Sequence, residues 1–586
     1  MRTRTKIVCT IGPSVGTYEK MVELMNAGMS VARLNFSHGT HEEHLQSIKN
    51  LKKAREKLQR PMAIMLDTHG PKIRVGKLPE GALSLKPKQR LKLVEKETGR
   101  PDEIPVNPIE IADAVSVGMK ILFDDGYIIS HVVEKGEKEV VVEIENAGVL
   151  KSGKGVNIPG AIIPLPALTP GDIEDLKFGC KHDVDVVAAS FIRSANHILA
   201  IKELLAKEGK PGILVIAKIE STQGIEHFDS IAQVADGIMV ARGDLGVEVD
   251  LAQVPKLQKM MIRKCYQACK PVITATQMLE SMISNPRPTR AEVSDVANAI
   301  YDSTSAVMLS GETAVGKYPI ETVERMRSIV LEAEADFNYH EFFEKRSQRD
   351  YHDVSSAVSI AAVKTAYCAN AKAIFAFTAS GQTARLVSRL RPGMPIVALT
   401  PDEKTYQQLA FNWGVVPVLC KGCTNIKEAF AAASRYAIEQ GIISFGDLVV
   451  ITAGAPFGKK GTTNMMMVEN IGDILVRGHK GFGHKTSGKV IFVLSPESHD
   501  PDRIEGRLIV IPYCDNTFLP FLKKAGGVIL ENSIGDTASE KYAALAAKTF
   551  EIPVMTRADG ALSILKEGEE VTLDPQKGLI YRGSDD

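Results

Sequence analysis

Residues 213–244 read ILVIAKIESTQGIEHFDSIAQVADGIMVARGD. The pattern of this stretch, a short apolar run followed by polar residues, recurs along the first half of the chain. Two short apolar runs begin at Ile213 and Gly237, and their length and β-branched residues are typical of buried strands. The first run ends in Lys218 and Glu220, and the second ends in an Arg-Gly-Asp triplet. The stretch therefore predicts two neighbouring strands with polar carboxyl ends.

Six further runs of this kind lie on either side, most of them roughly 25–35 residues apart. They begin at Lys6, Ser30, Met62, Asp185, Val272 and Ala306. Helical patterns lie between them, including residues 18–27, 41–58, 195–207 and 253–268. Eight strands that alternate with helices predict a (β/α)8 barrel.

One interval breaks this repeat. About 120 residues separate the third and fourth strands, which is more than one helix and two loops need. Residues 138–144 (KEVVVEI) are typical of a strand, and residues 124–126 (DDG) are typical of a hairpin turn. We therefore expect a small β-rich lid domain over residues 71–166, inserted into a catalytic barrel formed by residues 1–70 and 167–337.

The pattern changes after the barrel. A helix over residues 355–369 and strands over 373–377, 396–399 and 448–452 predict an open α/β domain spanning 338–476. Residues 477–489 are rich in Gly, Lys and His, so we expect a linker. A last α/β unit is expected over 490–586.

The composition limits the possible functions. Of 586 residues, 71 are Lys or Arg and 71 are Asp or Glu, and this balance argues against nucleic-acid binding. No apolar stretch approaches the ~18 residues of a membrane span, and the amino terminus lacks a signal-peptide core, so we expect a cytoplasmic protein with no membrane partner. Eight scattered cysteines indicate reduced thiols, and we interpret Cys420 and Cys423 as ordinary loop cysteines rather than a metal or redox pair.

The strand ends carry the candidate chemistry, because active residues of a barrel lie at the carboxyl ends of its strands. Arg33, Asn35 and Ser37 alternate along the second strand and so share one face, although side chains that simply face water are an alternative. Further polar strand ends are residues 67–74, 274–277 and 310–313.

The fifth and sixth strands predict a metal and phosphate site. Glu220 and Asp244 are hard carboxylates of the kind that Mg²⁺ prefers, and Lys218 can neutralise a moving phosphoryl group. A buried ion pair between Lys218 and Glu220 is the alternative. Gly243 and Asp244 begin a helix, where backbone N–H groups can bind an anion.

Taken together, these strings resemble the pyruvate kinase family over about residues 1–476. The matching strings are 6–13 (KIVCTIGP), 33–39 (RLNFSHG), 66–71 (LDTHGP), 154–160 (KGVNIPG), 216–220 (IAKIE), 239–246 (MVARGDLG), 275–281 (ATQMLES) and 308–313 (MLSGET). The resemblance implies phosphoryl transfer from phosphoenolpyruvate to ADP, giving pyruvate and ATP in the last step of glycolysis. It also implies Mg²⁺ or Mn²⁺ as cofactor and a homotetramer.

The resemblance implies a role for each matching residue. Lys218, Arg33 and Thr276 would be catalytic, and Arg33, Gly243, Asp244 and Thr276 would bind substrate. Glu220 and Asp244 would hold the divalent metal. Asn35, His38, Arg74 and Lys154 would approach the nucleotide, and Asn35, Ser37, Asp67 and Thr68 match the monovalent-cation site.

Two residues depart from the family pattern at the entry to the insert. Members that require K⁺ carry Glu where this chain has Lys72, and members with Lys resemble the K⁺-independent group. We therefore expect activity without K⁺, although the four cation-site residues persist. The usual Lys of the Asp-Thr-Lys-Gly string is His69 here.

The remaining domains carry two weaker signals. Residues 378–383 (TASGQT) predict a phosphate cradle and resemble the family's effector loop for sugar phosphates or nucleotides, through Thr378, Ser380, Gly381 and Thr383. An ordinary helix cap is the alternative. The last unit resembles the swivelling phosphohistidine domain of phosphoenolpyruvate-utilising enzymes, but Tyr542 stands at the histidine position, which favours a packing or regulatory role.

Two other functions fit parts of this pattern. A metal-dependent aldolase or lyase on a barrel would share the metal carboxylates, but it would not need Lys154, the insert or ADP. A catalytically silent metabolite-binding regulator would be favoured by the loss of Lys218, Glu220 or Asp244, and all three are present.

Overall fold

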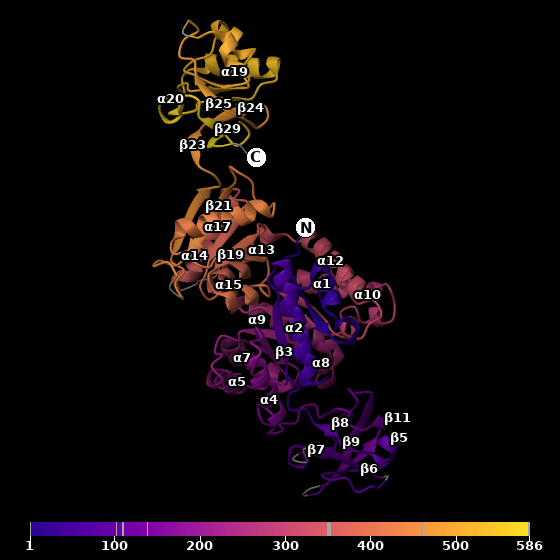
Figure 1. The fold of residues 1–586 in the computed structure, drawn as a ribbon. Helices are drawn as coiled ribbons and strands as arrows, with labels where there is room; N and C mark the ends of the chain where they lie inside the picture. Colours follow the sequence, from indigo (N-terminus) through magenta and orange to yellow (C-terminus); the bar gives the residue numbers. More distant parts are fainter. Residues whose placement is uncertain are drawn as a thin grey trace. The chain divides into compact units, whose positions relative to one another are not determined.

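The computed structural model describes residues 2–100, 102–107, 111–136, 139–347, 353–458, 461–497 and 499–583. Within them the predicted barrel is confirmed as a closed sheet of eight parallel strands (Figure 1). These strands are β1 (Lys6–Ile11), β2 (Val31–Asn35), β3 (Ala63–Asp67), β13 (Val186–Ala189), β14 (Leu214–Ile219), β15 (Gly237–Ala241), β16 (Val272–Ala275) and β17 (Ala306–Leu309).

The outer helices follow the predicted pattern closely. α1 (Tyr18–Ala27), α2 (His41–Leu58) and α5 (Ala195–Lys207) have the predicted bounds, and α9 (Val254–Gln267) is one residue shorter at each end. Local chemistry fixes the start of α2, since the Thr40 hydroxyl accepts from Glu43 N–H while the Glu43 carboxylate accepts from Thr40 N–H. Apolar side chains fill the barrel interior, and a larger apolar layer separates the sheet from the helices.

The parallel register brings the polar strand ends to one rim. Asn35 pairs with Asp67 across β2 and β3, and Asp67 pairs with Ala188 across β3 and β13. Lys218 of β14 pairs with Met239 of β15. The side chains that follow these positions therefore project from the same end of the barrel.

The predicted insert is a β-domain between β3 and α4 (Pro170–Lys181). Its main sheet has the order β12 (Val156–Asn157), β8 (Lys120–Phe123), β9 (Ile128–Lys135), β10 (Val140–Ile144), β6 (Arg90–Val94), β7 (Glu103–Asn107) and β4 (Arg74–Val75). A separate pair joins β5 (Ala82–Leu85) and β11 (Gly148–Lys151). The predicted turn joins β8 to β9, and its residues Asp124, Asp125 and Gly126 all have positive φ.

The chain forms two compact units, one of residues 1–356, 376–423 and 458–462 and the other of residues 357–375, 424–457 and 463–586. In the first unit β19 (Ile396–Thr400) pairs in parallel with β20 (Val415–Leu419), alongside α15 (Gln382–Arg389) and α16 (Glu403–Leu409). In the second, β21 (Leu448–Ala453) pairs antiparallel with β22 (Met465–Asn470). The helix α14 (Val354–Cys368) and the strand β18 (Ala373–Phe377) also lie where the sequence predicted them.

The two cysteines of the CxxC string are not free thiols. Cys420 and Cys423 form a disulfide just after β20, so the expectation of reduced loop cysteines is wrong for this pair. Their sequence separation of three residues brings the two Cα atoms to 5.9 Å, within the range that a disulfide bridges.

The last part of the second unit is built on an eight-stranded sheet. Its order is β23 (Ile474–Arg477), β30 (Leu579–Arg582), β29 (Glu570–Asp574), β25 (Thr486–Phe492), β26 (Leu508–Ile511), β27 (Gly527–Leu530), β28 (Val554–Thr556) and β24 (Lys480–Phe482). The helix α19 (Thr537–Phe550) carries Tyr542, which is half-buried against the apolar core of this sheet. The packing or regulatory role expected for this last unit stays a prediction.

The predicted linker over residues 477–489 is wrong, because β23, β24 and β25 occupy most of it. Its glycines allow close packing rather than flexibility. A Cβ atom on Gly478 would lie 2.4 Å from Met555 Cγ, and one on Gly481 would lie 2.3 Å from the carbonyl oxygen of Pro575.

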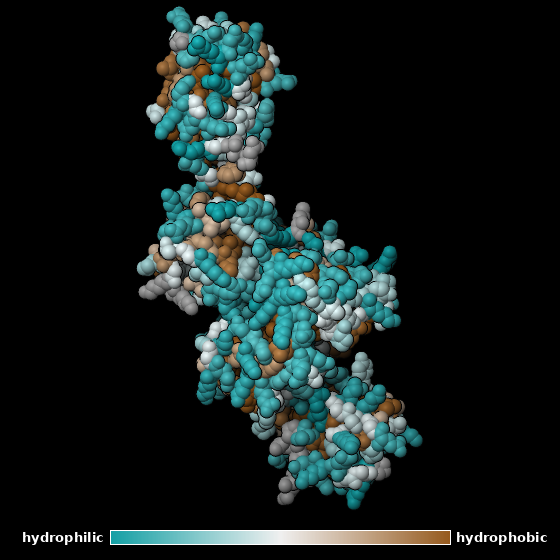
Figure 2. Space-filling model, viewed as in Figure 1, coloured by the Kyte–Doolittle hydropathy of each residue, from teal (hydrophilic) through white to brown (hydrophobic). Residues whose placement is uncertain are grey.

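The surface agrees with the balanced composition. Hydrophilic residues cover most of the face seen in Figure 2. Among the described residues, no helix combines the length and the apolar character that crossing a bilayer requires.

Candidate active site

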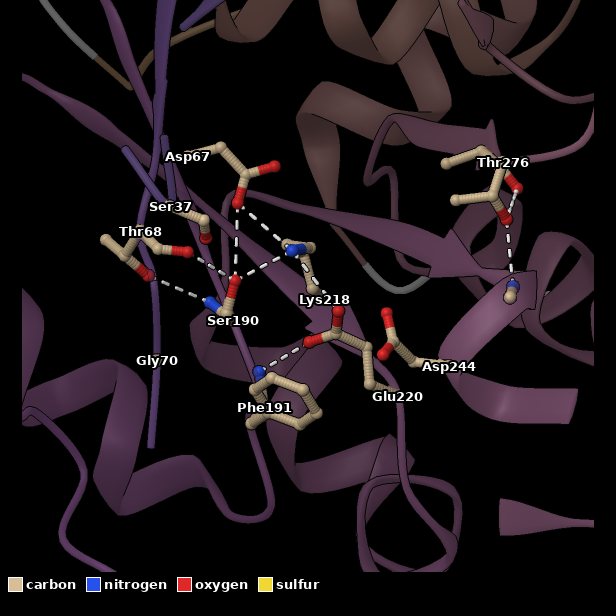
Figure 3. A network of polar contacts seen from close by, with 12 residues as sticks. Ser37, Asp67, Thr68, Gly70, Ser190, Phe191, Lys218, Glu220, Asp244 and Thr276 are labelled. Atoms are coloured by element: carbon tan, nitrogen blue, oxygen red, sulfur yellow. Dashed lines mark hydrogen bonds and ion pairs between the residues drawn. The ribbon is translucent and has the colours of Figure 1, made fainter. Parts of the chain in front are cut away.

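Lys218, at the carboxyl end of β14, lies at the centre of a buried polar network (Figure 3). Its Nζ donates to Ser190 Oγ at 2.7 Å and to Asp67 Oδ1 at 3.0 Å, and it lies 3.2 Å from Glu220 Oε1. Burial alone would lower the pKa of Lys218, but the two carboxylates raise it above its usual value. The side chain is therefore a fixed ammonium, and the ion pair considered as an alternative is present.

Asp67 is the counter-ion of two cations. Its Oδ2 lies 2.6 Å from Arg33 Nε, and a second guanidinium nitrogen of Arg33 donates to Thr10 Oγ1 at 3.0 Å. Burial would raise the pKa of Asp67, but Arg33 and Lys218 hold it below its ordinary value. Asp67 therefore fixes the directions of Arg33 and Lys218 at the rim.

Glu220 and Asp244 lie next to one another, after the neighbouring strands β14 and β15 (Figure 3). Phe191 N–H donates to Glu220 Oε2 at 2.6 Å. Burial, opposed by Lys218 and reinforced by the Asp244 charge, raises the pKa of Glu220 to about 7. A divalent cation bound between Glu220 and Asp244 would offset the repulsion between the two carboxylates and stabilise both in the ionised form.

The number of protein ligands also suits Mg²⁺. Among the described residues there is no group of three or more His, Cys, Asp or Glu side chains arranged to hold a metal. Mg²⁺ sites commonly use one or two carboxylates and take their other ligands from water and substrate phosphate. Glu220 and Asp244 therefore fit such an ion together with a phosphorylated substrate.

Gly243 lies in the first turn of the helix α8 (Arg242–Glu248), and Thr276 directly follows β16. Gly243 N–H donates to Thr276 Oγ1 at 2.9 Å, so this amide, expected to bind substrate, contacts Thr276 here. Thr276 has a φ of 65°, a strained conformation for a β-branched residue. Arg242 stabilises it by donating to the carbonyl oxygens of Ala275 and Thr276.

The four residues of the monovalent-cation pattern lie on adjacent strand ends, but they are not four open ligands. Ser37 N–H donates to Asn35 Oδ1 at 3.3 Å, and Ser190 N–H donates to Thr68 Oγ1 at 3.1 Å. Asp67 is also engaged, because both of its carboxylate oxygens already contact cations, namely Arg33 and Lys218.

Lys72 lies beside the metal carboxylates. Its Nζ is 3.0 Å from Asp244 Oδ1 and 3.4 Å from Asp125 Oδ1 in the lid, and it stands 5.6 Å from the centre of the Phe191 ring. Burial would lower the pKa of Lys72, but Asp244 and Asp125 raise it. A permanent positive charge therefore lies next to the acidic pair.

Two of the residues expected near the nucleotide, Arg74 and Lys154, lie in the inserted β-domain. Arg74 donates to the carbonyl oxygen of Gly153 at 2.9 Å and to His69 Nε2 at 3.1 Å, and Lys154 forms an ion pair with Asp124 at 2.7 Å. His38 is exposed. Burial and the Arg74 charge lower the pKa of His69, so a neutral imidazole accepts the Arg74 hydrogen bond.

The loop after β18 has the geometry of a cradle. Thr378 and Thr383 are buried, and Gly381 has a φ of 78° directly before α15. Gly381 is the N-cap of α15, so a phosphate cradle and an ordinary helix cap both remain open for this loop. Ser380 contributes its carbonyl oxygen, which accepts from Arg385 at 3.2 Å.

Sequence reasoning missed Ser190, which bonds to Lys218, Asp67 and Thr68. A signal for it exists, since Ser190 is the first polar residue after the apolar strand β13. It also missed Arg242 and Asp125, for which no spacing rule applies, because their partners come from distant parts of the chain.

Three protein-family descriptions match successive segments of this chain, and known proteins align with nearly its whole length. The family described as "Pyruvate kinase, barrel domain" matches residues 2–323, "Pyruvate kinase, alpha/beta domain" matches 356–469, and "PEP-utilising enzyme, mobile domain" matches 504–578. Proteins named pyruvate kinase from Geobacillus stearothermophilus and Staphylococcus haemolyticus are each 43% identical to it, and one from Bacillus licheniformis is 42% identical. The alignments cover 99–100% of this chain and 99% of each relative.

Proposed function

This chain belongs to the pyruvate kinase family, and we propose that the network around Lys218 performs the family's phosphoryl transfer. The enzyme is a phosphotransferase that moves the phosphoryl group of phosphoenolpyruvate to ADP, giving pyruvate and ATP in the last step of glycolysis. One observation carries the residue assignment: the Lys218 ammonium is held between Asp67, Ser190 and Glu220 at the barrel mouth.

Lys218 is placed to stabilise the phosphoryl group during transfer. Phosphoryl transfer passes through a loose state that needs positioning and charge neutralisation more than covalent catalysis. The ammonium is held by fixed hydrogen bonds, so little reorganisation is needed when negative charge develops on the phosphoryl oxygens. Arg33, held by Asp67 and Thr10, supplies a second donor for the substrate phosphate.

Glu220 and Asp244 would hold Mg²⁺ or Mn²⁺. A bound divalent cation supplies charge neutralisation for the phosphate and orients it against the nucleophile. Before binding, Lys218 and Lys72 partly neutralise the two acids, because each lies within 3.2 Å of one of them. The bond from Phe191 N–H and the Lys218 ammonium hold the two oxygens of the Glu220 carboxylate in place beside Asp244 (Figure 3).

Gly243, Asp244 and Thr276 would contact the carboxylate and enolate portions of the substrate. The hydrogen bond from Gly243 N–H to the Thr276 hydroxyl supports this grouping, since it holds the two groups 2.9 Å apart. Substrate would take over the Gly243 N–H, leaving the Thr276 hydroxyl near the carbon of the enolate that must gain a proton. The strained backbone of Thr276 holds the hydroxyl there.

Asn35, His38, Arg74 and Lys154 would bind ADP and ATP. Arg74 and Lys154 lie at the lid, and their present partners, a carbonyl oxygen and Asp124, are groups that phosphate oxygens can replace. The neutral state of His69 avoids a second positive charge next to Arg74.

Lys72 supports activity without added K⁺. Its ammonium is already beside Asp244, where it supplies a monovalent positive charge to the metal site. The residues Asn35, Ser37, Asp67 and Thr68 would then form a vestigial cation site, since Asp67 is bound to Arg33 and Lys218.

Regulation and assembly follow from the family and from the loop geometry. The loop that contains Thr378, Ser380, Gly381 and Thr383 would bind a sugar phosphate or nucleotide effector, supported by the positive φ of Gly381 at the N-cap of α15. We further propose a homotetramer as the working state.

The decisive experiment is a coupled assay for pyruvate formation that depends on ADP, phosphoenolpyruvate and Mg²⁺. Activity that is lost in Lys218→Met and kept in Lys207→Met, a control on the exposed surface of α5, would support the assignment. Pyruvate release without ADP would instead mean that the phosphoryl group passes to water, which is a phosphatase reaction, and would overturn the assignment.

A further inference from the structure

Ser190 is a buried serine that directly follows β13 at the rim of the barrel, with 4% of its surface exposed. Ala189 of β13 pairs with Ala217 of β14, so the next residues along the two strands, Ser190 and Lys218, emerge side by side. Figure 3 shows the two side chains pointing toward one another. Ser190 therefore lies where it can act on Lys218 directly.

The hydroxyl group of Ser190 accepts a hydrogen bond from Lys218. Its Oγ lies 2.7 Å from Lys218 Nζ, 2.7 Å from the carbonyl oxygen of Thr68 and 3.2 Å from Asp67 Oδ1. A hydroxyl has one hydrogen to donate, and carbonyl and carboxylate oxygens can only accept it. Since an ammonium can only donate, the hydrogen of Ser190 goes to Thr68 or Asp67, and an oxygen lone pair faces Lys218.

This acceptor differs from the other partners of Lys218 because it carries no charge. The ammonium has three N–H groups, and its two other partners, Asp67 and Glu220, are carboxylates. Each carboxylate offsets part of the positive charge that a phosphoryl group in transfer would meet. Ser190 fixes the direction of one N–H group and leaves that positive charge intact.

Ser190 is itself fixed by the residues at the end of β3. Its N–H donates to Thr68 Oγ1 at 3.1 Å. Gly70 packs against it so closely that a Cβ atom on Gly70 would lie 2.6 Å from Ser190 Cβ. Because both its N–H and its hydroxyl are bonded, the serine offers Lys218 an acceptor in a constant place.

We propose that Ser190 is a positioning residue for the phosphoryl transfer, an inference that rests on the function proposed for Lys218. The Ser190 hydroxyl holds the Lys218 ammonium in the direction from which it meets the phosphoryl group, and it acts on the reaction through that ammonium. A serine that merely ties the end of β13 to the end of β3 would instead stabilise the fold and act independently of Lys218. The two roles therefore differ in what Ser190 contributes once Lys218 has been removed.

The test is a double-mutant cycle on the full chain, which compares the parent with Ser190→Ala, Lys218→Met and the combined variant. The measured quantities are kcat and KM for phosphoenolpyruvate in ADP-dependent pyruvate formation. We expect Ser190→Ala to lower kcat of the parent at least about tenfold, the scale for losing one hydrogen bond to a charged group, with KM changed by no more than about threefold. In the Lys218→Met background the same change should alter kcat by less than about twofold.

A matched control lies four residues further along the chain. Ser194→Ala makes the same chemical change at a serine whose side chain forms no capping bond to α5 in the part of the chain that the structure describes, and it should leave kcat unchanged. Tm, measured beside the kinetics, shows which variants are folded. Ser190→Cys carries the same test if Ser190→Ala does not fold, because a thiol of similar shape is only a weak acceptor.

Two results would overturn the positioning role of Ser190. One is a folded Ser190→Ala protein with parent-like kcat beside an inactive Lys218→Met, which rejects the role of Ser190 and leaves that of Lys218 in place. The other is an equal fold-loss from Ser190→Ala in both backgrounds, since Ser190 would then act independently of Lys218. Parent-like turnover in Lys218→Met would reject the function proposed for Lys218, and the inference with it.

Discussion

Replacing Lys218 by methionine removes the ammonium from the barrel mouth and keeps an unbranched side chain in its place. The Nζ atom that is lost lies 2.7 Å from Ser190 Oγ, 3.0 Å from Asp67 Oδ1 and 3.2 Å from Glu220 Oε1. A single donor preorganised to this degree contributes about 2.7 kcal/mol or more to the transition state. We therefore expect kcat to fall at least about 10²-fold.

The fold should survive this substitution. Asp67 keeps its ion pair with Arg33 at 2.6 Å. Glu220 can take up a proton, because its pKa is already raised to about 7 and the loss of Lys218 raises it further. The free energy of unfolding should fall by about 3–5 kcal/mol, the range for removing one partner of a buried ion pair.

The assay is steady-state pyruvate formation coupled to NADH oxidation, with kcat and KM for phosphoenolpyruvate measured beside Tm. We expect the loss to fall on kcat, while KM changes by no more than a few-fold, because the ammonium acts most strongly on the phosphoryl group in transfer. Turnover near that of the parent in a folded Lys218→Met protein would refute the role assigned to Lys218. Lys207→Met provides the matched control.

Three further predictions follow from other contacts. The parent enzyme should reach full activity in buffer free of K⁺ and Na⁺, whereas Lys72→Glu should need added K⁺; strict K⁺ dependence of the parent would reject the role of Lys72. His69→Gln, a neutral replacement, should keep KM for ADP within about twofold, because Arg74 still meets an uncharged acceptor; a large rise would mean that His69 acts as a cation. Gly481→Ala should lower the unfolding free energy of the last domain by about 1–3 kcal/mol, measured by Tm, since its methyl group would press on the Pro575 backbone; an unchanged Tm would contradict the close packing.

The sequence predicted the barrel well because its signals are local. Apolar runs, helix periodicity and caps such as Thr40 act over a few residues, so the strands and several helix bounds lie where the pattern places them. The string at 477–489 failed for a physical reason. Glycine permits both flexibility and close approach, and only the spatial neighbours of Gly478 and Gly481 distinguish the two.

The sequence predicted which residues form the candidate site better than it predicted the hydrogen bonds and ion pairs between them. Lys218, Glu220 and Asp244 follow strands whose ends must meet at one rim, so their proximity follows from the repeat. The bonding of Asp67 to both Arg33 and Lys218 depends on side-chain directions that no spacing encodes. Asp125 lies in the insert, so its contact with Lys72 depends on how the lid folds over the rim.

The position of Lys72 has a consequence for how the enzyme meets changes in its surroundings. A cation drawn from solution occupies its site according to its concentration, so a dependent enzyme slows when that ion becomes scarce. A charge attached to the backbone has a constant effective concentration and arrives with every newly folded chain. Under the role proposed for Lys72, the rate of this step does not change with the concentration of monovalent cations in the medium.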